Sequence, residues 1–117
     1  QDNYSSYHLY IIRIKNLFEG LNKLNLFTSL REAGILVNLH YIPVYQQPFY
    51  EEIGYNNEDY SESEKYYEEA LSLPIHTLLK DEEQDFVIES VLNFLSRQKT
   101  FIKNHINEDL KGFQTIF

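Results

Sequence analysis

The sequence predicts one α/β domain of modest size. Its 117 residues suffice for a single domain. Apolar residues make up 43% of the chain, which is enough to form a core and excludes a disordered tail. Short runs of β-branched and aromatic residues alternate with segments whose apolar residues recur every three or four positions. The expected order is strand, helix, strand, long loop, two helices and an amphipathic tail.

The first strand is expected over 7–14, where aromatic and β-branched residues dominate. Such a continuous apolar run is typical of a central strand covered on both faces. His8 lies inside this run, so a hydrogen-bonded core histidine is the favoured interpretation over a ligand.

A helix is expected over 23–33, after a looser stretch that ends at Asn22. Gly34 suits the left-handed position that ends a helix. The apolar stripe of this region would comprise Leu17, Leu21, Leu24, Phe27 and Leu30.

A second strand is expected over 35–41, and Pro43 ends its ladder. Alternation gives this strand two different faces. The residues expected to face the core are Val37, Leu39 and Tyr41. The residues expected on the opposite face are Asn38 and His40.

The rest of the chain predicts a tyrosine-rich loop over 41–60 and two helices. Ser61 with Glu64 fits a capping box for the first helix, and Asp81 is expected to cap the second. The segment 72–75 between the helices reads as a short extended piece. The tail beyond position 96 would carry a second helical stripe, interrupted by Gly112, of Ile102, Ile106, Leu110, Phe113 and Phe117.

Composition excludes several classes of function. With 18 acidic and 10 basic residues the net charge is −8, which repels nucleic acid and disfavours anionic membranes. There is no cysteine, so disulfides, thiolate metal sites and cysteine catalysis are excluded. No apolar run approaches the roughly 18 residues of a membrane-spanning helix. Methionine is also absent and the numbering begins at Gln1, so we expect a piece of a longer parent protein.

No complete catalytic motif is present. The four histidines lack the spacing of a metal site, and neither a Gly-x-Ser-x-Gly elbow nor a glycine-rich phosphate loop occurs. His40 either presents its ring to a ligand at the strand end or bonds the neighbouring loop. Seven tyrosines either line a pocket or pack the loop on itself, namely Tyr41, Tyr45, Tyr50, Tyr55, Tyr60, Tyr66 and Tyr67. The residues alone therefore predict a soluble α/β piece without a self-contained active site.

Several segments, in order, resemble the small C-terminal domain of the DegT/StrS sugar-nucleotide aminotransferases. The resemblance extends from about Ser5 to Leu95. Its segments are Ser6-Tyr7-His8-Leu9-Tyr10, Leu30-Arg31-Glu32-Ala33-Gly34-Ile35, Val37-Asn38-Leu39-His40-Tyr41-Ile42-Pro43-Val44, Leu71-Ser72-Leu73-Pro74-Ile75 and Asp81-Glu82-Glu83-Gln84. The His-Tyr-Ile-Pro-Val stretch is most similar to the branch that aminates a UDP-linked keto sugar in pseudaminic acid synthesis.

The resemblance implies an α+β small domain over 1–97, with a short antiparallel sheet covered by helices, as in fold-type-I enzymes dependent on pyridoxal phosphate (PLP). Residues 98–117 would be an amphipathic helical extension or the start of a further segment. The parent would transfer an amino group, usually from glutamate, to a nucleotide-linked keto sugar. It would be a cytoplasmic homodimer.

The resemblance also divides the chemistry between two domains. The catalytic lysine and the PLP-binding residues would belong to a large domain outside this chain, so no catalytic, cofactor-binding or metal-binding residue is expected here. The small domain would close over the substrate. His40, Tyr41 and Asn38 match the segment nearest the substrate and are the expected contacts to the sugar nucleotide.

Two alternatives from other functional classes stay open. One is a non-catalytic binding module that descended from this domain. The other is an acidic helical scaffold that uses its tyrosine loop as a protein interface and self-associates through its tail.

Overall fold

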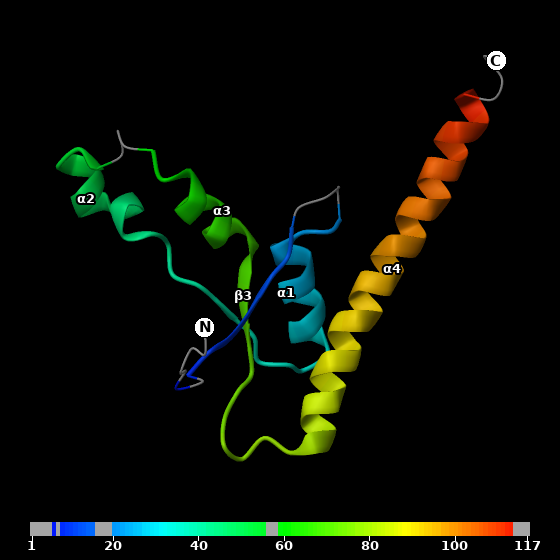
Figure 1. The fold of residues 1–117 in the computed structure, drawn as a ribbon, viewed down its shortest axis with the longest axis horizontal. Coiled ribbons are helices and arrows are strands. Elements are labelled where there is room, and N and C mark those ends of the chain that lie inside the picture. Colours follow the sequence, from blue (N-terminus) through cyan, green and yellow to red (C-terminus); the bar gives the residue numbers. More distant parts are fainter. Residues whose placement is uncertain (1–5, 7, 16–19, 56–58, 114–117) are drawn as a thin grey trace, which may run out of the picture. The chain divides into compact units, whose positions relative to one another are not determined.

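The computed structural model describes residues 6, 8–15, 20–55 and 59–113, and beyond position 101 it describes a side chain only for Lys103 (Figure 1). Contacts group the chain into two units, Gln1–Leu79 and Lys80–Phe117.

The first unit is a small antiparallel sheet with helices, which confirms the expected fold class. The three strands lie in the order β1-β3-β2, and both pairings are antiparallel. The elements are β1 (Tyr10–Arg13), α1 (Lys23–Glu32), β2 (Asn38–Leu39), the 3₁₀ helix η1 (Val44–Gln46), α2 (Pro48–Glu52), α3 (Ser61–Glu69) and β3 (Ala70–Leu73).

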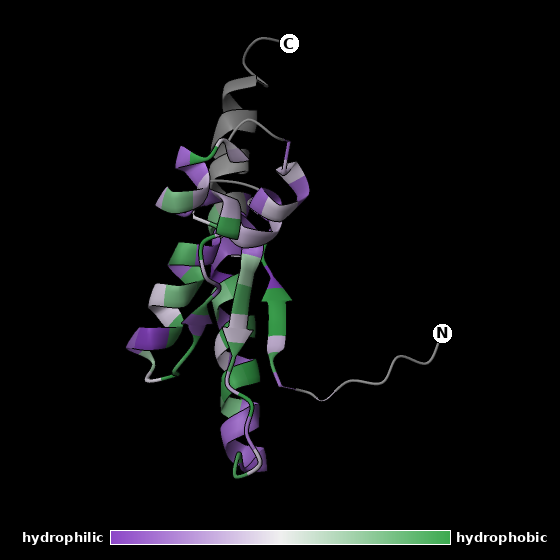
Figure 2. Ribbon diagram, turned by 90° about the vertical axis from the view of Figure 1, so that its left-hand side faces the viewer, coloured by the Kyte–Doolittle hydropathy of each residue, from purple (hydrophilic) through white to green (hydrophobic). Residues whose placement is uncertain are grey.

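The central strand is β3, not the first strand. Leu71 of β3 pairs with Ile12 on one side and with Leu39 on the other. Three of the four β3 residues are buried, whereas most of β1 is exposed. The expectation of a central first strand is therefore wrong, although Figure 2 shows β1 as largely hydrophobic. His8 is exposed, so its expected place in the core is wrong as well.

The second strand is shorter than expected and its inward face is different. Val37 is fully buried, but Leu39 is 44% and Tyr41 97% exposed, so these two do not face the core. The Val37 amide donates to the Ile35 carbonyl at 3.0 Å, a three-residue turn that interrupts strand alternation before β2 begins. The buried pair is consequently Ile35 and Val37.

The helix α1 has the expected start and stop. The Asn22 side chain accepts a hydrogen bond from the Asn25 amide at 2.8 Å and caps the first turn. At the other end Gly34 has a φ of +83°, and the Ile35 amide donates to the Leu30 carbonyl at 2.9 Å. These features form a Schellman motif, which satisfies the last carbonyls of the helix.

The buried face of α1 differs from the expected stripe. Leu26 and Leu30 are fully buried, while Leu24 is 64% exposed. Leu26 and Leu30 lie one turn apart, and Leu24 projects from the far side of the helix. Leu17 lies outside the described residues.

The segment expected to be a loop over 41–60 contains η1 and α2. Pro48 is the first residue of α2, a position that proline favours because its missing N–H has no partner there. The expected capping box of α3 is wrong, because Ser61 is already helical. The Asp59 carboxylate instead accepts from the Ser61 amide at 3.0 Å.

The second unit contains α4 (Asp81–Phe113). Asp81 is its first helical residue and not its cap. The Glu83 carboxylate accepts from the Lys80 amide at 2.9 Å and satisfies the start of the helix. The helix continues through Gly112, and its stripe residues from Ile102 onward have no described side chains. The boundary expected after position 97 stays a prediction. None of the helices in the described ranges is long and apolar enough to cross a bilayer.

Candidate functional site

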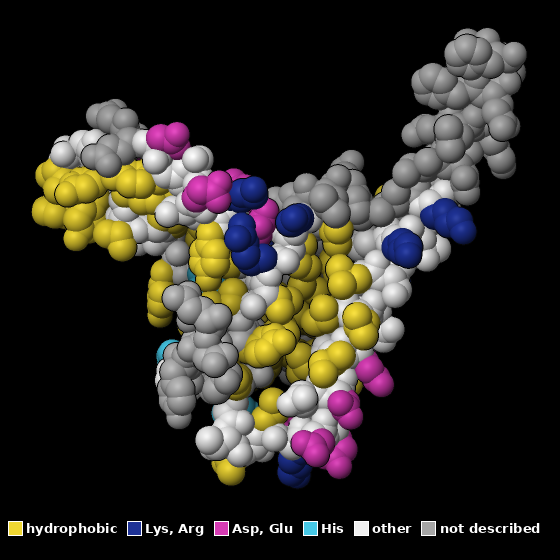
Figure 3. All heavy atoms as spheres, viewed as in Figure 1, with side chains coloured by type: hydrophobic (Ala, Val, Ile, Leu, Met, Phe, Trp, Pro, Cys, Tyr) yellow, Lys and Arg dark blue, Asp and Glu magenta, His cyan; other side chains and the backbone are white. Residues whose placement is uncertain are grey.

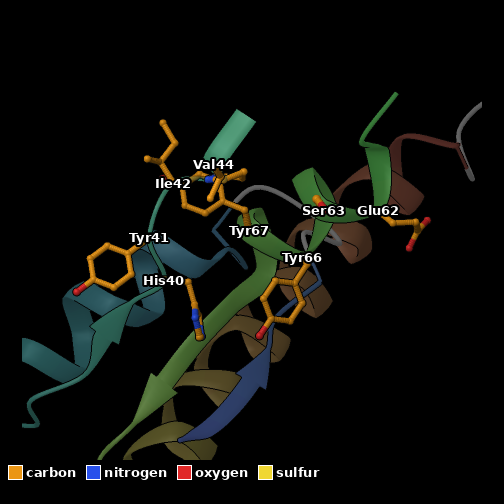
Figure 4. A pocket seen from close by; sticks show the side chains of 9 residues that line it. His40, Tyr41, Ile42, Val44, Glu62, Ser63, Tyr66 and Tyr67 are labelled. Carbon is orange, nitrogen blue, oxygen red and sulfur yellow. The ribbon is translucent and has the colours of Figure 1, made fainter. Parts of the chain in front are cut away.

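A groove of about 510 Å³ lies between α3 and the segment that follows β2. Figure 4 shows this segment and α3 on opposite sides of the groove. The lining residues are His40, Tyr41, Ile42, Pro43, Val44, Glu62, Ser63, Tyr66 and Tyr67. The groove thus combines apolar surface with hydroxyl groups, one imidazole and one carboxylate.

His40 is held by the central strand. Its Nε2 lies 3.2 Å from the Oγ of Ser72, a β3 residue that is only 6% exposed. Its ring centroid lies 5.6 Å from that of Tyr66 on α3, and Figure 4 shows the two rings side by side. His40 therefore bonds the sheet, not the neighbouring loop, and also lines the groove.

An ion pair lies next to the Tyr66 ring. Arg13 Nη2 lies 2.7 Å from Glu69 Oε2, and Arg13 Nε donates to the same oxygen at 3.0 Å. Glu69 is 7% exposed, so this carboxylate requires a cationic partner. The Arg13 guanidinium lies 5.5 Å from the Tyr66 ring centroid. The pair joins the end of β1 to the end of α3 and fixes that wall of the groove.

Tyr67 is held from the side of α1. The Lys23 ammonium donates to the Tyr67 carbonyl and lies 4.3 Å from the centroid of the Tyr67 ring. Burial lowers the pKa of Lys23, and the nearby Glu68 carboxylate opposes that shift. Lys23 does not line the groove.

The structure brings two of the three expected site residues to the groove. His40 lines it and is half-buried. Tyr41 also lines it, but Figure 4 shows its ring directed away from His40 and Tyr66. Asn38 is exposed on β2 and does not line the groove. Substrate binding by these residues stays a prediction.

On the second wall of the groove, Tyr66 and Tyr67 were expected from the sequence as possible pocket residues, whereas Glu62 and Ser63 were not identified. The residues of this wall come from α3, more than twenty positions after His40. The available signal was the spacing of Glu62, Ser63, Tyr66 and Tyr67, which places them on one side of a helix. No sequence pattern indicates Ser72 as the partner of His40, because only the pairing of the strands brings Ser72 next to the His40 ring.

The tyrosines divide between the two roles considered for them. Tyr41, Tyr66 and Tyr67 line the groove. Other tyrosines pack the 41–60 segment on itself. The centroids of the stacked pair Tyr45 and Tyr60 are 4.1 Å apart, and those of the edge-on pair Tyr50 and Tyr55 are 5.8 Å apart.

The groove does not fit a PLP site. No lysine or arginine is among its lining residues, so it offers neither a Schiff-base amine nor a cation for the cofactor phosphate. The described residues also contain no group of three or more side chains suited to a metal ion. The arrangement suits contact with a neutral, hydroxyl-rich ligand, because tyrosine rings and an imidazole offer stacking surface and hydrogen bonds together.

The comparisons with known proteins match most of this chain. The model of the DegT/DnrJ/EryC1/StrS aminotransferase family matches residues 1–92. The spore coat polysaccharide biosynthesis protein SpsC of Bacillus subtilis is 33% identical over 92 residues, which are 77% of this chain and 24% of SpsC. A UDP-4-amino-4,6-dideoxy-N-acetyl-beta-L-altrosamine transaminase of Helicobacter pylori is 36% identical over 88 residues, which are 75% of this chain and 23% of that protein.

Two solved structures share the fold. The Helicobacter pylori aminotransferase PseC, described as involved in pseudoaminic acid biosynthesis, superposes with a TM-score of 0.68 at 32% identity. The superposed region is 77% of this chain and 24% of PseC. The putative sugar aminotransferase Spr1654 of Streptococcus pneumoniae, in its PMP form, gives a TM-score of 0.69 at 33% identity, covering 80% of this chain and 23% of that one. This chain therefore spans about a quarter of the length of the proteins it resembles.

Proposed function

Because this chain belongs to the DegT/DnrJ/EryC1/StrS aminotransferase family, we propose that it is the small C-terminal domain of a PLP-dependent sugar aminotransferase. The parent enzyme transfers an amino group, with glutamate as the donor, to the keto carbon of a nucleotide-linked sugar. The family match, together with relatives named as UDP-sugar transaminases, supports this substrate class. The parent enzyme is a cytoplasmic homodimer in this proposal.

The groove is the part of this domain that contacts the substrate. The observation that carries this assignment is His40, held by Ser72 at 3.2 Å and exposed to a groove lined by tyrosines. A nucleotide sugar carries a diphosphate, but the groove lacks lysine and arginine and contains Glu62. The groove therefore suits the sugar or the base, and cations from outside it hold the diphosphate.

PLP belongs to another part of the parent enzyme. When bound, it supplies an electron sink for the carbon that exchanges its amino group. The residues of this chain would act on the substrate side. Tyr66 and His40 would orient the sugar, and the apolar wall of Ile42 and Val44 would exclude water.

Substitution of His40 in the full-length parent enzyme tests this role. His40→Ala is expected to lower kcat/KM for the nucleotide sugar about tenfold or more, the scale of one lost hydrogen bond to a polar substrate group. The cofactor absorbance and its affinity should be unchanged. His76→Ala is the matched control, because His76 is exposed and does not line the groove. Wild-type turnover in His40→Ala would remove His40 from the site.

A non-catalytic binding module is the second candidate, and the lack of a lysine in the groove favours it over catalysis by this chain alone. The reading frame that encodes Gln1 discriminates between the candidates. A lysine-bearing PLP domain encoded upstream in the same frame decides for the enzyme. A start codon just before Gln1 decides for the module.

A further inference from the structure

Ser72 and His40 meet on one face of the sheet of the first unit. The register of β2 and β3 places Ser72 directly opposite Asn38. His40 lies two positions after Asn38, just beyond the end of β2, so it is the diagonal neighbour of Ser72 across the two strands. An aromatic side chain can reach a diagonal neighbour, and the Nε2 of His40 lies 3.2 Å from the Oγ of Ser72. The strand register therefore sets this contact.

The Ser72 hydroxyl is buried, whereas the His40 ring reaches the groove. Ser72 is 6% exposed and lies on the central strand, which is paired on both sides. A buried hydroxyl that accepts a hydrogen bond without donating one leaves its own proton unsatisfied, and this costs free energy. An unprotonated Nε2 is an acceptor within reach of that proton. The burial of Ser72 therefore favours donation from its hydroxyl to Nε2.

We propose that Ser72 is a positioning residue that fixes the tautomer of His40. When Nε2 accepts from Ser72, the single proton of the neutral imidazole lies on Nδ1. An imidazole in water favours the opposite tautomer, with its proton on Nε2, so this contact reverses the intrinsic preference. The Nδ1–H group is then left to donate to a ligand in the groove. The ligand atom that meets it must be an acceptor, such as a hydroxyl or carbonyl oxygen.

Arg13, a basic residue close to this contact in the sheet register, is neutralised by a carboxylate. Ser72 pairs with Ile11 of β1, and Arg13 lies two positions after Ile11, on the same face. The Arg13 guanidinium binds Glu69 at 2.7 Å. Figure 3 shows basic side chains beside acidic ones where α3 ends. The Ser72 hydroxyl, and not this cation, therefore determines which nitrogen of the His40 ring carries the proton.

The role of the tautomer in substrate binding rests on the proposed function, whereas the tautomer itself does not. The tautomer is a property of the 117-residue chain and is measured without substrate. Substrate binding is measured in the full-length parent enzyme. A failure of the proposed function is therefore distinguishable from a failure of the hydrogen-bond assignment.

Nitrogen NMR of isotope-labelled imidazole rings tests the tautomer in the 117-residue chain. Spectra are recorded at about pH 8.5, well above the ordinary histidine pKa of about 6.5. His40 should show a protonated Nδ1 and an unprotonated Nε2, and Ser72→Ala should shift the proton toward Nε2. His40→Ala assigns the resonances, and the exposed His76 should keep its spectrum in every variant. A protonated Nε2 in the wild type, or an unchanged tautomer in Ser72→Ala, would overturn the proposal.

Two further variants separate the hydroxyl of Ser72 from the general effect of a substitution. Ser72→Thr keeps a hydroxyl and suits a strand, so it should keep the proton on Nδ1. Ser90→Ala is the matched control, because the Ser90 hydroxyl also donates a hydrogen bond, to the Phe86 carbonyl at 2.7 Å, but Ser90 does not line the groove. It should leave the His40 spectrum unchanged. A folded Ser72→Thr chain with the tautomer of Ser72→Ala would contradict the role of the hydroxyl.

A double-variant cycle in the full-length parent enzyme tests the effect on the substrate. Ser72→Ala should raise KM for the nucleotide sugar about threefold to tenfold, with a smaller change in kcat, because the ring loses its oriented donor. In a His40→Ala background the same substitution should change kcat/KM by less than about twofold, since Ser72 acts through His40. Equal losses in both backgrounds would mean that Ser72 only supports the fold and would overturn the positioning role. Wild-type turnover in His40→Ala would refute the proposed function of the groove instead.

Discussion

Truncation of Leu71 should destabilise the first unit more than truncation of Leu39, its neighbour in the sheet. The two leucines are in register on adjacent strands and undergo the same chemical change to alanine. Leu71 is fully buried on the central strand, whereas Leu39 is 44% exposed on an edge. The pair therefore isolates the effect of burial.

The structure sets the expected magnitudes. Leu71→Ala removes a fully buried side chain and leaves a cavity, which costs about 3 kcal/mol within a usual range of roughly 2–5. Leu39→Ala loses about half of a leucine's transfer free energy and leaves no enclosed cavity, which costs about 1 kcal/mol. With a urea m-value of roughly 1–3 kcal/mol per molar, the Leu71 variant should unfold about 1–3 M earlier.

Tyrosine fluorescence during urea unfolding is a suitable assay. All 10 tyrosines precede Lys80, so their emission reports on the first unit and not on α4. An equal or larger loss of stability for Leu39→Ala would refute the assignment of β3 as the central strand. That result would instead support the alternation read from the sequence, in which Leu39 faces the core.

Two further predictions concern the ends of helices. Gly34→Ala should lower the free energy of unfolding by about 1–2 kcal/mol, because an L-residue is strained at φ +83° although a Cβ there would meet nothing within 4 Å. Gly34→Asn should cost less in the same denaturation assay, and an equal cost would contradict the conformational explanation. The Ser61 amide lowers the pKa of Asp59 below 3.8. Asp59→Asn should therefore destabilise the chain at neutral pH, and its difference from the wild type should shrink as the pH falls below about 4 through the folded-state pKa. A difference that stayed constant down to pH 2 would contradict this linkage, and Asp85→Asn serves as the control.

Local features of the fold were predictable because they depend on residues close in sequence. Asn22 and Gly34 delimit α1 through a cap and a left-handed turn, and both effects act within a few residues. The extended piece at 72–75 and the start of the helix at Asp81 were likewise visible, although β3 lies at Ala70–Leu73, two positions earlier. The helix also continues to Phe113, through the region expected to be a separate tail.

The candidate site was predictable in part: one wall belongs to a contiguous motif, and on the other wall only the tyrosines were considered as pocket residues. His40 and Tyr41 belong to a contiguous motif that resembles the family, and both line the groove. Tyr66 and Ser72 reach the same place from α3 and β3, so their contribution depends on how strands pair across the sheet. Asn38 shares the motif but lies outside the groove.

The sequence by itself determined the family, the acidic charge, the helix ends and the segment that carries His40, because each depends on residue identity or short spacing. The tertiary structure decided which strand is central. An apolar run such as Ile11-Ile12 is compatible with an edge strand or a central strand, and the pairing of the neighbouring strands decides between them. Strand order also decided that Ser72 meets His40 and that Arg13 reaches Glu69. Those contacts join residues 32 and 56 positions apart, and only folding of the chain brings such distant residues together.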